Sequence, residues 1–138
     1  MVVDASVAVR WVVSQPGSEM AEQVMRSRER LVAPELILAE AGNALWKYVR
    51  AGLVRPDIAE QAISRVAGPF DALVSLPPLA EQAMRIAMEL DHAIYDCFYL
   101  ALADVHDTAV LTADKRLLNK TRRTRFARRV AALADYRA

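Results

Sequence analysis

The sequence predicts an α/β fold, a single domain in which helices flank a mostly parallel central sheet. Two observations carry this prediction. Short apolar runs of strand length alternate along the chain with longer amphipathic segments of helical period. The 138 residues suffice for one domain, and no repeat, low-complexity tract or long linker divides them. Because strands that alternate with helices pair in parallel, we expect one domain over residues 1–138.

Five short runs have the length and the apolar composition of buried strands. The expected strands are residues 1–4, 31–33, 72–76, 108–112 and 129–134. The third of them is bounded by Pro77 and Pro78, because proline cannot donate to a strand ladder. All five are short enough for a small sheet.

Seven further segments carry helical period or helix-boundary signals. Ser18 is expected to cap one helix, and Pro34 and Pro56 suit the first turns of two others. Gly52 supplies a stop. The expected helices are residues 6–14, 18–28, 34–50, 56–68, 79–90, 95–105 and 115–120. Segment 95–105 is almost wholly apolar, so we expect it to be buried.

Acidic residues stand at the ends of two expected strands. Asp4 ends the apolar run in MVVDASV, and Asp114 follows the run in AVLTADKRL. In a parallel sheet ligands bind beyond the carboxyl ends of the strands, and both acids would emerge at that edge. Asp4 could instead cap the helix that follows it, and Asp114 could cap the helix that starts at Lys115.

Two further acids interrupt apolar helix faces. Glu40, in ELILAEAGNALWKY, falls three residues after Ile37 and four before Ala44. Asp96, in IYDCFYLALADV, lies about one turn from Tyr99 on a face that is otherwise apolar. An unpaired buried charge is costly, so each acid alone is more often a cap or half of an ion pair. Asp96 could also sit in the first turn of its own helix.

Four such acids are harder to explain separately than together. Few basic residues stand near them in the sequence. Clustered carboxylates without matching cations indicate a metal site, and hard oxygen ligands favour Mg²⁺ or Mn²⁺ over zinc. The one cysteine and two histidines have no zinc-site spacing, and we expect His92 and His106 at the surface or at helix ends.

A basic block extends from residue 115 to residue 129 and contains no acid. Its cations are Lys115, Arg116, Lys120, Arg122, Arg123, Arg125, Arg128 and Arg129. Such a block is either a solvated helix face or a stripe that binds phosphates. The net charge of +1 conceals this asymmetry.

The blocks VVDASV, LAEAGNAL, YDCFYLALA and LTADKRLL, in this order, resemble the PIN-domain family and most closely its VapC-type toxins of toxin–antitoxin pairs. The resemblance spans residues 2–118 and continues more weakly in RVAALADYR. The family's acidic quartet would fall on Asp4, Glu40, Asp96 and Asp114. Ser6, Asn43 and Thr112 match polar positions that usually support the quartet. Cys97 stands where the family more often has Ala or Ser.

The resemblance implies an endoribonuclease that cleaves RNA with water activated by Mg²⁺ or Mn²⁺. The implied metal ligands are Asp4, Glu40, Asp96 and Asp114, the last directly or through water. Thr112 would orient the attacking water, and Ser6 and Asn43 would support the ligands.

The same resemblance gives the basic block a role in binding RNA. The implied RNA-binding residues are Lys115, Arg116, Arg122, Arg123 and Arg125. A VapB-type antitoxin is expected as a protein partner that lays a helix into an apolar groove, and a homodimer is expected as well. No apolar run approaches the roughly 20 residues of a membrane span, and the apolar start is short for a signal peptide. We therefore expect a cytoplasmic protein without a membrane partner.

Two alternatives stay open at this point. A catalytically inactive PIN-like module could bind RNA or protein with the same residues. A receiver-type phosphoacceptor domain is also a small α/β fold with acids at strand ends. It needs an acidic pair after the first strand and an Asp after a central one, whereas VVDASV provides one acid and LVAPEL and LVSLPP end without Asp.

Overall fold

The computed structural model describes residues 1–137 and, within them, contains one five-stranded sheet. Its strands are β1 (Val2–Val3), β2 (Val32–Pro34), β3 (Ala72–Val74), β4 (Val110–Thr112) and β5 (Val130–Ala132). The strand order is β3-β2-β1-β4-β5, and every neighbouring pair is parallel. The predicted fold class is confirmed, and β1 lies at the centre of the sheet.

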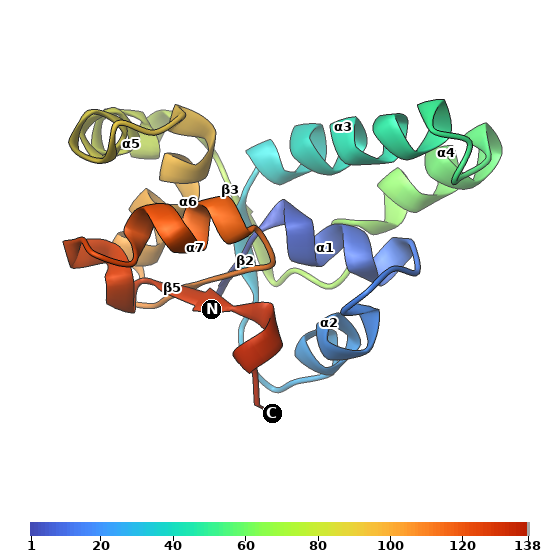
Figure 1. Cartoon of the computed structure of the whole chain (residues 1–138), viewed down its shortest axis with the longest axis horizontal. Coiled ribbons are helices and arrows are strands. Elements are labelled where there is room, and N and C mark those ends of the chain that lie inside the picture. The colour runs from blue at the N-terminus through green and yellow to red at the C-terminus, as the bar shows by residue number, and fades with distance from the viewer. Residues whose placement is uncertain (138) are drawn as a thin grey trace.

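Seven α-helices surround this sheet in residues 1–137. They are α1 (Ala5–Val12), α2 (Ser18–Met25), α3 (Leu36–Arg50), α4 (Pro56–Arg65), α5 (Pro77–Leu90), α6 (Ile94–Val105) and α7 (Lys115–Thr121). Two short 3₁₀ turns flank β5, η1 (Arg125–Arg128) and η2 (Leu133–Asp135). Figure 1 shows α3 and α4 extending on one side of the strands and α5 and α6 on the other. Among these residues no helix is both long and apolar enough to cross a bilayer.

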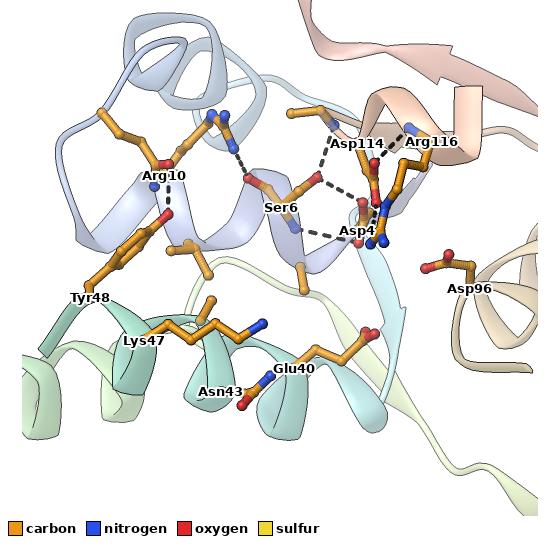
Figure 2. Close-up of a pocket in the computed structure, with 15 residues that line it drawn as sticks. Asp4, Ser6, Arg10, Glu40, Asn43, Lys47, Tyr48, Asp96, Asp114 and Arg116 are labelled. Atoms are coloured by element: carbon orange, nitrogen blue, oxygen red, sulfur yellow. Dashed lines mark hydrogen bonds and ion pairs between the residues drawn. The ribbon is translucent and has the colours of Figure 1, made fainter. Parts of the chain in front are cut away.

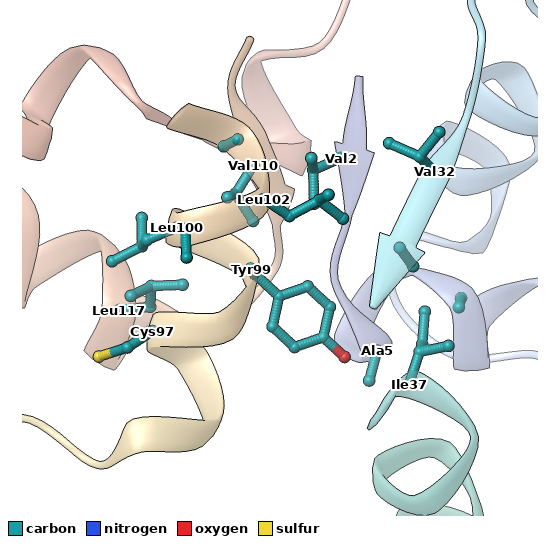
Figure 3. Packing of buried hydrophobic residues seen from close by; sticks show 14 of the residues in the cluster. Val2, Ala5, Val32, Ile37, Cys97, Tyr99, Leu100, Leu102, Val110 and Leu117 are labelled. Atoms are coloured by element: carbon teal, nitrogen blue, oxygen red, sulfur yellow. The ribbon is translucent and has the colours of Figure 1, made fainter. Parts of the chain in front are cut away.

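The central strands β1 and β4 contribute alternate side chains to two cores, because successive residues of a strand point to opposite faces. Val2 and Val110 pack against α6, where Tyr99 and Leu102 are fully buried (Figure 3). Their neighbours Val3 and Leu111 belong to the opposite core with residues of α1, α2 and η2. The middle of the apolar segment 95–105 is therefore buried as predicted, whereas its ends, Tyr95 and Val105, are exposed.

Two predicted boundaries are wrong in detail. Ser18 is the first residue of α2 and not its cap. Gly17, in the left-handed region at φ +89°, precedes the helix at the cap position. The Ser18 hydroxyl accepts the Gln15 N–H at 3.0 Å. Pro34 ends β2 and does not open α3, because the ladder continues past it through the Glu35 N–H, which donates to the Val74 carbonyl at 2.8 Å. The stop at Gly52, which has φ +71°, is confirmed.

Candidate active site

A cavity of about 420 Å³ opens at the carboxyl edge of β1 and β4, between α1, α3 and the start of α6 (Figure 2). All four acids that the sequence singled out line it: Asp4, Glu40, Asp96 and Asp114. The parallel topology brings Asp4 and Asp114 together, since β1 and β4 are adjacent and end in register, and Glu40 and Asp96 reach the cavity from α3 and α6. Within residues 1–137, however, no group of three or more His, Cys, Asp or Glu side chains lies close enough to hold an ion as it stands.

Asp4 is the most deeply buried of these acids, with 7% of its surface exposed. It caps α1 by accepting the Ser6 N–H at 3.4 Å, and it accepts the Ser6 hydroxyl at 2.7 Å. The Thr112 hydroxyl also donates to Asp4. Burial raises the pKa of Asp4, the bonds from Thr112 and Ser6 oppose that rise, and the negative charge of Asp96 adds to it. Asp4 is thus both the helix cap and a cavity acid.

The hydroxyls of Ser6 and Thr112 tie the turn after β1 to the turn after β4. Thr112 accepts the Asp114 N–H at 3.0 Å, and Ser6 accepts the Ala113 N–H at 2.9 Å. The two hydroxyl oxygens lie 3.3 Å apart. Thr112 is 0% exposed, its hydroxyl donates to Asp4, and it is not among the residues that line the cavity.

Glu40 projects from α3, and its carboxylate accepts a hydrogen bond from a tyrosine on α6. The Tyr99 hydroxyl, fully buried on α6, donates to Glu40 Oε2 at 2.5 Å. Burial raises the pKa of Glu40 to about 7, together with repulsion from Asp4 and Asp96 and against the lowering effect of the Tyr99 bond. The sequence pattern assigned Tyr99 only to an apolar face and missed this contact.

Asp96 is held by a histidine that sequence reasoning placed outside the site. His92 Nε2 lies 2.5 Å from Asp96 Oδ2, and the two side chains are only 17% and 22% exposed. Asp91, which ends α5 in the left-handed region at φ +46°, turns the chain so that His92 faces α6. His92 follows the end of α5, in line with the expectation of a helix-end residue, but the sequence analysis did not foresee its contact with Asp96.

Asp114 combines the two roles that the sequence left open. It caps α7 by accepting the Arg116 N–H at 2.7 Å, and it lines the cavity with 27% of its side chain exposed. The Arg116 guanidinium approaches Asp114 Oδ2 at 3.5 Å. One carboxyl oxygen is therefore engaged by the helix start while the side chain still faces the cavity.

Cations also line the cavity, contrary to the scarcity of basic residues near the acids in the sequence. Arg10 reaches it from α1, Lys47 from α3 and Arg116 from α7. Asn43 lines the same wall of α3 as Lys47, as expected for a residue that supports the site (Figure 2). Their common helical spacing with Glu40 was a signal in the sequence, since residues three, four and seven apart share a helix face.

Some cations of the basic block form ion pairs that the sequence does not reveal. The Arg125 guanidinium donates to both carboxylate oxygens of Glu89 on α5, with nitrogen–oxygen distances of 2.9, 3.1 and 2.9 Å. Arg129 pairs with Asp104 at 3.2 Å and with Asp107 at 2.8 Å. The acids missing from the block in the sequence are thus supplied by α5 and by the end of α6. Arg125 is thus paired with Glu89 although its side chain is 56% exposed, and Arg122, Arg123 and Lys115 are exposed as well.

The fold and site define a parallel α/β domain with an acidic cavity at the carboxyl edge of its sheet. The PIN domain family matches residues 1–123, and the chain belongs to this family. That membership rules out the receiver-type alternative.

Named relatives and a solved structure agree with this assignment. The chain is 33% identical to Ribonuclease VapC3 of Pyrobaculum aerophilum, over 87% of this chain and 93% of that protein. It is 36% identical to Exonuclease VapC9 of the same organism, over 71% of this chain and 72% of that protein. It is 28% identical to Ribonuclease VapC1 of Mycobacterium tuberculosis, over 84% of this chain and 86% of that protein. The crystal structure of PAE2754 from Pyrobaculum aerophilum superposes with a TM-score of 0.71 at 30% identity, covering 96% of this chain and 83% of that one.

Proposed function

We propose that this protein is a metal-dependent endoribonuclease, the toxin of a type II toxin–antitoxin pair, which hydrolyses phosphodiester bonds of RNA. The observation that carries the proposal is the gathering of four carboxylates around one cavity, with the pKa values of Asp4 and Glu40 both raised. Burial is the main cause of both rises, and repulsion among the acids adds to it. A bound cation would stabilise the charged form of these carboxylates.

The donor set fits Mg²⁺ or Mn²⁺. Its members offer carboxylate oxygens, which hard divalent ions prefer. The residues that would hold the ion are Asp4, Glu40, Asp96 and Asp114. When bound, such an ion supplies an activated water and stabilises charge on the phosphate.

The remaining residues hold the acids in place for that chemistry. Ser6 and Thr112 orient Asp4 through their hydroxyls, and this role suits a fully buried Thr112 better than contact with the attacking water. Tyr99 orients Glu40. Asn43 lies on the wall of the cavity, where it can contact a bound RNA strand.

The exposed cations Lys115, Arg116, Arg122 and Arg123 are proposed to attract the RNA backbone at the mouth of the cavity and along α7. Among them Arg116 lines the cavity itself. Arg125 contributes less, because its guanidinium is engaged by Glu89.

The pairing of β5 with β4 supports a single domain over residues 1–138.

A VapB-type antitoxin, a homodimeric state and a cytoplasmic location are proposed from the named VapC relatives. A nuclease toxin must be restrained in the cell that makes it. We expect that expression of the chain alone slows growth, that the Asp4→Asn form does not, and that co-expression of the antitoxin restores growth.

An exonuclease is the second candidate, since one relative at 36% identity carries that name. A circular RNA separates the two activities because it has no ends. We expect wild type with Mn²⁺ to linearise the circle, EDTA to stop the reaction, and Asp4→Asn to lack it. Cleavage of linear but not circular RNA would establish the exonuclease instead, and no metal-dependent cleavage of either would leave an inactive binding module.

A further inference from the structure

The active-site cavity is polarised along α3. Glu40, Asn43 and Lys47 lie on one face of this helix and all line the cavity. At about 1.5 Å of rise per residue, Glu40 and Lys47 are separated by roughly 10 Å along the helix axis. The wall of α3 therefore has a carboxylate at one end and a cation at the other.

The Lys47 side chain extends along the cavity towards its acidic end (Figure 2). This direction is intrinsic to the helix, because side chains lean towards the helix N-terminus, which here is the side of Glu40. None of the ion pairs within residues 1–137 involves Lys47, so its ammonium lies more than 4.0 Å from every carboxylate oxygen of that part of the chain.

The two other cations of the cavity are already engaged. Arg10 donates through Nε to the Pro16 carbonyl at 2.9 Å and through a terminal nitrogen to the Ser6 carbonyl. Arg116 approaches Asp114 at 3.5 Å. Lys47 is thus the cavity cation whose donors the described residues leave unused.

We propose that Lys47 binds a phosphate of the RNA strand adjacent to the one being cleaved, and so guides the strand along α3 into the acidic end of the cavity. This inference rests on the proposed nuclease function and names a contact within it. A lysine ammonium is a compact point charge with three donors, which suits the non-bridging oxygens of a phosphodiester. The scissile phosphate would lie among the acids, and the strand's next negative charge would meet Lys47.

A competing explanation is that Lys47 only stabilises the end of its helix. Lys47 and Arg50 both lie in the last turn of α3, where a cation interacts favourably with the helix dipole. Arg50 differs in its surroundings, because it lies over the ring of Trp46 at 5.0 Å, and it is not among the residues that line the cavity. Arg50→Met is therefore the matched control: the same turn loses one charge, outside the cavity.

The test measures binding of a fluorescent single-stranded RNA of mixed sequence in EDTA, where no cleavage occurs, over a range of salt concentrations. Each phosphate contact contributes about 0.7 to the slope of log affinity against log salt. We expect Lys47→Met to reduce the slope by about 0.7 and to weaken binding about fivefold at 0.1 M salt. Lys47→Arg should restore both values, and Arg50→Met should change neither.

Equal slopes for Lys47→Met and wild type, or equal losses in Lys47→Met and Arg50→Met, would overturn the inference, as would a wild type that binds no RNA at low salt. Because binding is measured without metal, it is independent of whether the circular RNA is cut. In cleavage assays Lys47→Met should raise KM and leave kcat nearly unchanged, since the contact is made to a phosphate that does not react.

Discussion

The strand-end acids and the helix acids of the cavity are held in different ways. Asp4 and Asp114 follow strands that lie side by side, and each caps the helix that begins after it. Glu40 and Asp96 lie on α3 and α6, and each is held by a side chain, Tyr99 or His92. Strand topology and backbone caps position the first pair, with the Ser6 and Thr112 hydroxyls added at Asp4, whereas each acid of the second pair is held by one side-chain contact.

This difference predicts how robust each half of the site is. Asp4 has a backbone contact and two hydroxyl contacts, so it keeps some support when one neighbouring side chain is lost. A contact such as His92–Asp96 depends on one imidazole and is lost with it. The four predictions below test this contrast, from the largest expected effect to the smallest.

The largest effect is expected from removing the charge of Asp4 itself. Asp4→Asn keeps the shape and one acceptor oxygen, which can retain the cap on the Ser6 N–H, but an NH2 group replaces the oxygen that accepts the Ser6 and Thr112 hydroxyls, and the most buried charge of the site is removed. We expect RNA cleavage with Mn²⁺ to fall at least about a hundredfold, which corresponds to roughly 2.7 kcal/mol. The circular dichroism spectrum should stay unchanged. Asp57→Asn, on the exposed start of α4, is the control and should cleave as wild type does.

The second prediction concerns the side-chain support of the helix acids. His92→Asn removes the 2.5 Å contact to Asp96 and leaves that carboxylate free to rotate. Hydrogen-bond partners of metal ligands typically change metal affinity ten- to a hundredfold. We expect a loss of about twentyfold in Mn²⁺ affinity, measured by titration calorimetry. The sequence has two histidines, and the exposed His106 provides the control, His106→Asn. Equal affinities in all three proteins would show that His92 plays no part in orienting Asp96.

The same contrast explains what the sequence could predict. Strand ends and caps are local features, so the fold class and the positions of Asp4 and Asp114 follow from apolar runs and their boundaries. Glu40 and Asp96 could be singled out as polar breaks in apolar faces. The residues that hold these two acids could not be predicted. Tyr99 is 59 residues from Glu40 in the chain, and the apolar periodicity of a helix does not show which residue its hydroxyl contacts.

The basic block illustrates a related limit. Its eight cations look unpaired in the sequence, but the structure pairs Arg125 and Arg129 with acids from other elements, while Arg122 and Arg123 are exposed. Glu89 precedes Arg125 by 36 residues, and Asp104 lies on α6. Lys47 was missed because its role depends on the cavity between two helices, which no single segment reveals.

The third prediction tests the link between the two strand-end turns. Thr112→Val keeps the volume but removes the hydroxyl that donates to Asp4 and accepts the Asp114 N–H. A buried polar group left without its partner costs about 1–3 kcal/mol. We expect the free energy of unfolding to fall by about 1.5 kcal/mol in urea denaturation. Thr121 is the matched control: it is also buried, but its hydroxyl only donates to carbonyls of its own helix, so Thr121→Val should cost less. Equal losses would mean that Thr112 is an ordinary core residue.

The smallest effect concerns the charge of Glu40 in the metal-free protein. Its pKa is raised to about 7 from a usual value of 4.5, so between these two pH values the folded state binds more protons than the unfolded state. The stability that this group contributes is therefore fully present below pH 4.5 and is lost as the pH rises through 7. Because solvent screens a partly exposed carboxyl, we expect the loss to be about 1 kcal/mol, or roughly 4 °C in melting temperature.

Glu40→Gln keeps the Tyr99 contact without the charge. In EDTA it should melt with wild type at pH 4.5 and above wild type near pH 8, and Mn²⁺ should stabilise wild type more than the variant. Glu60→Gln, on the exposed face of α4, should show no such divergence. If Glu40→Gln melts below wild type at the higher pH, the Glu40 charge is stabilising in the metal-free fold, and Glu40 is a structural acid and not one that awaits a cation.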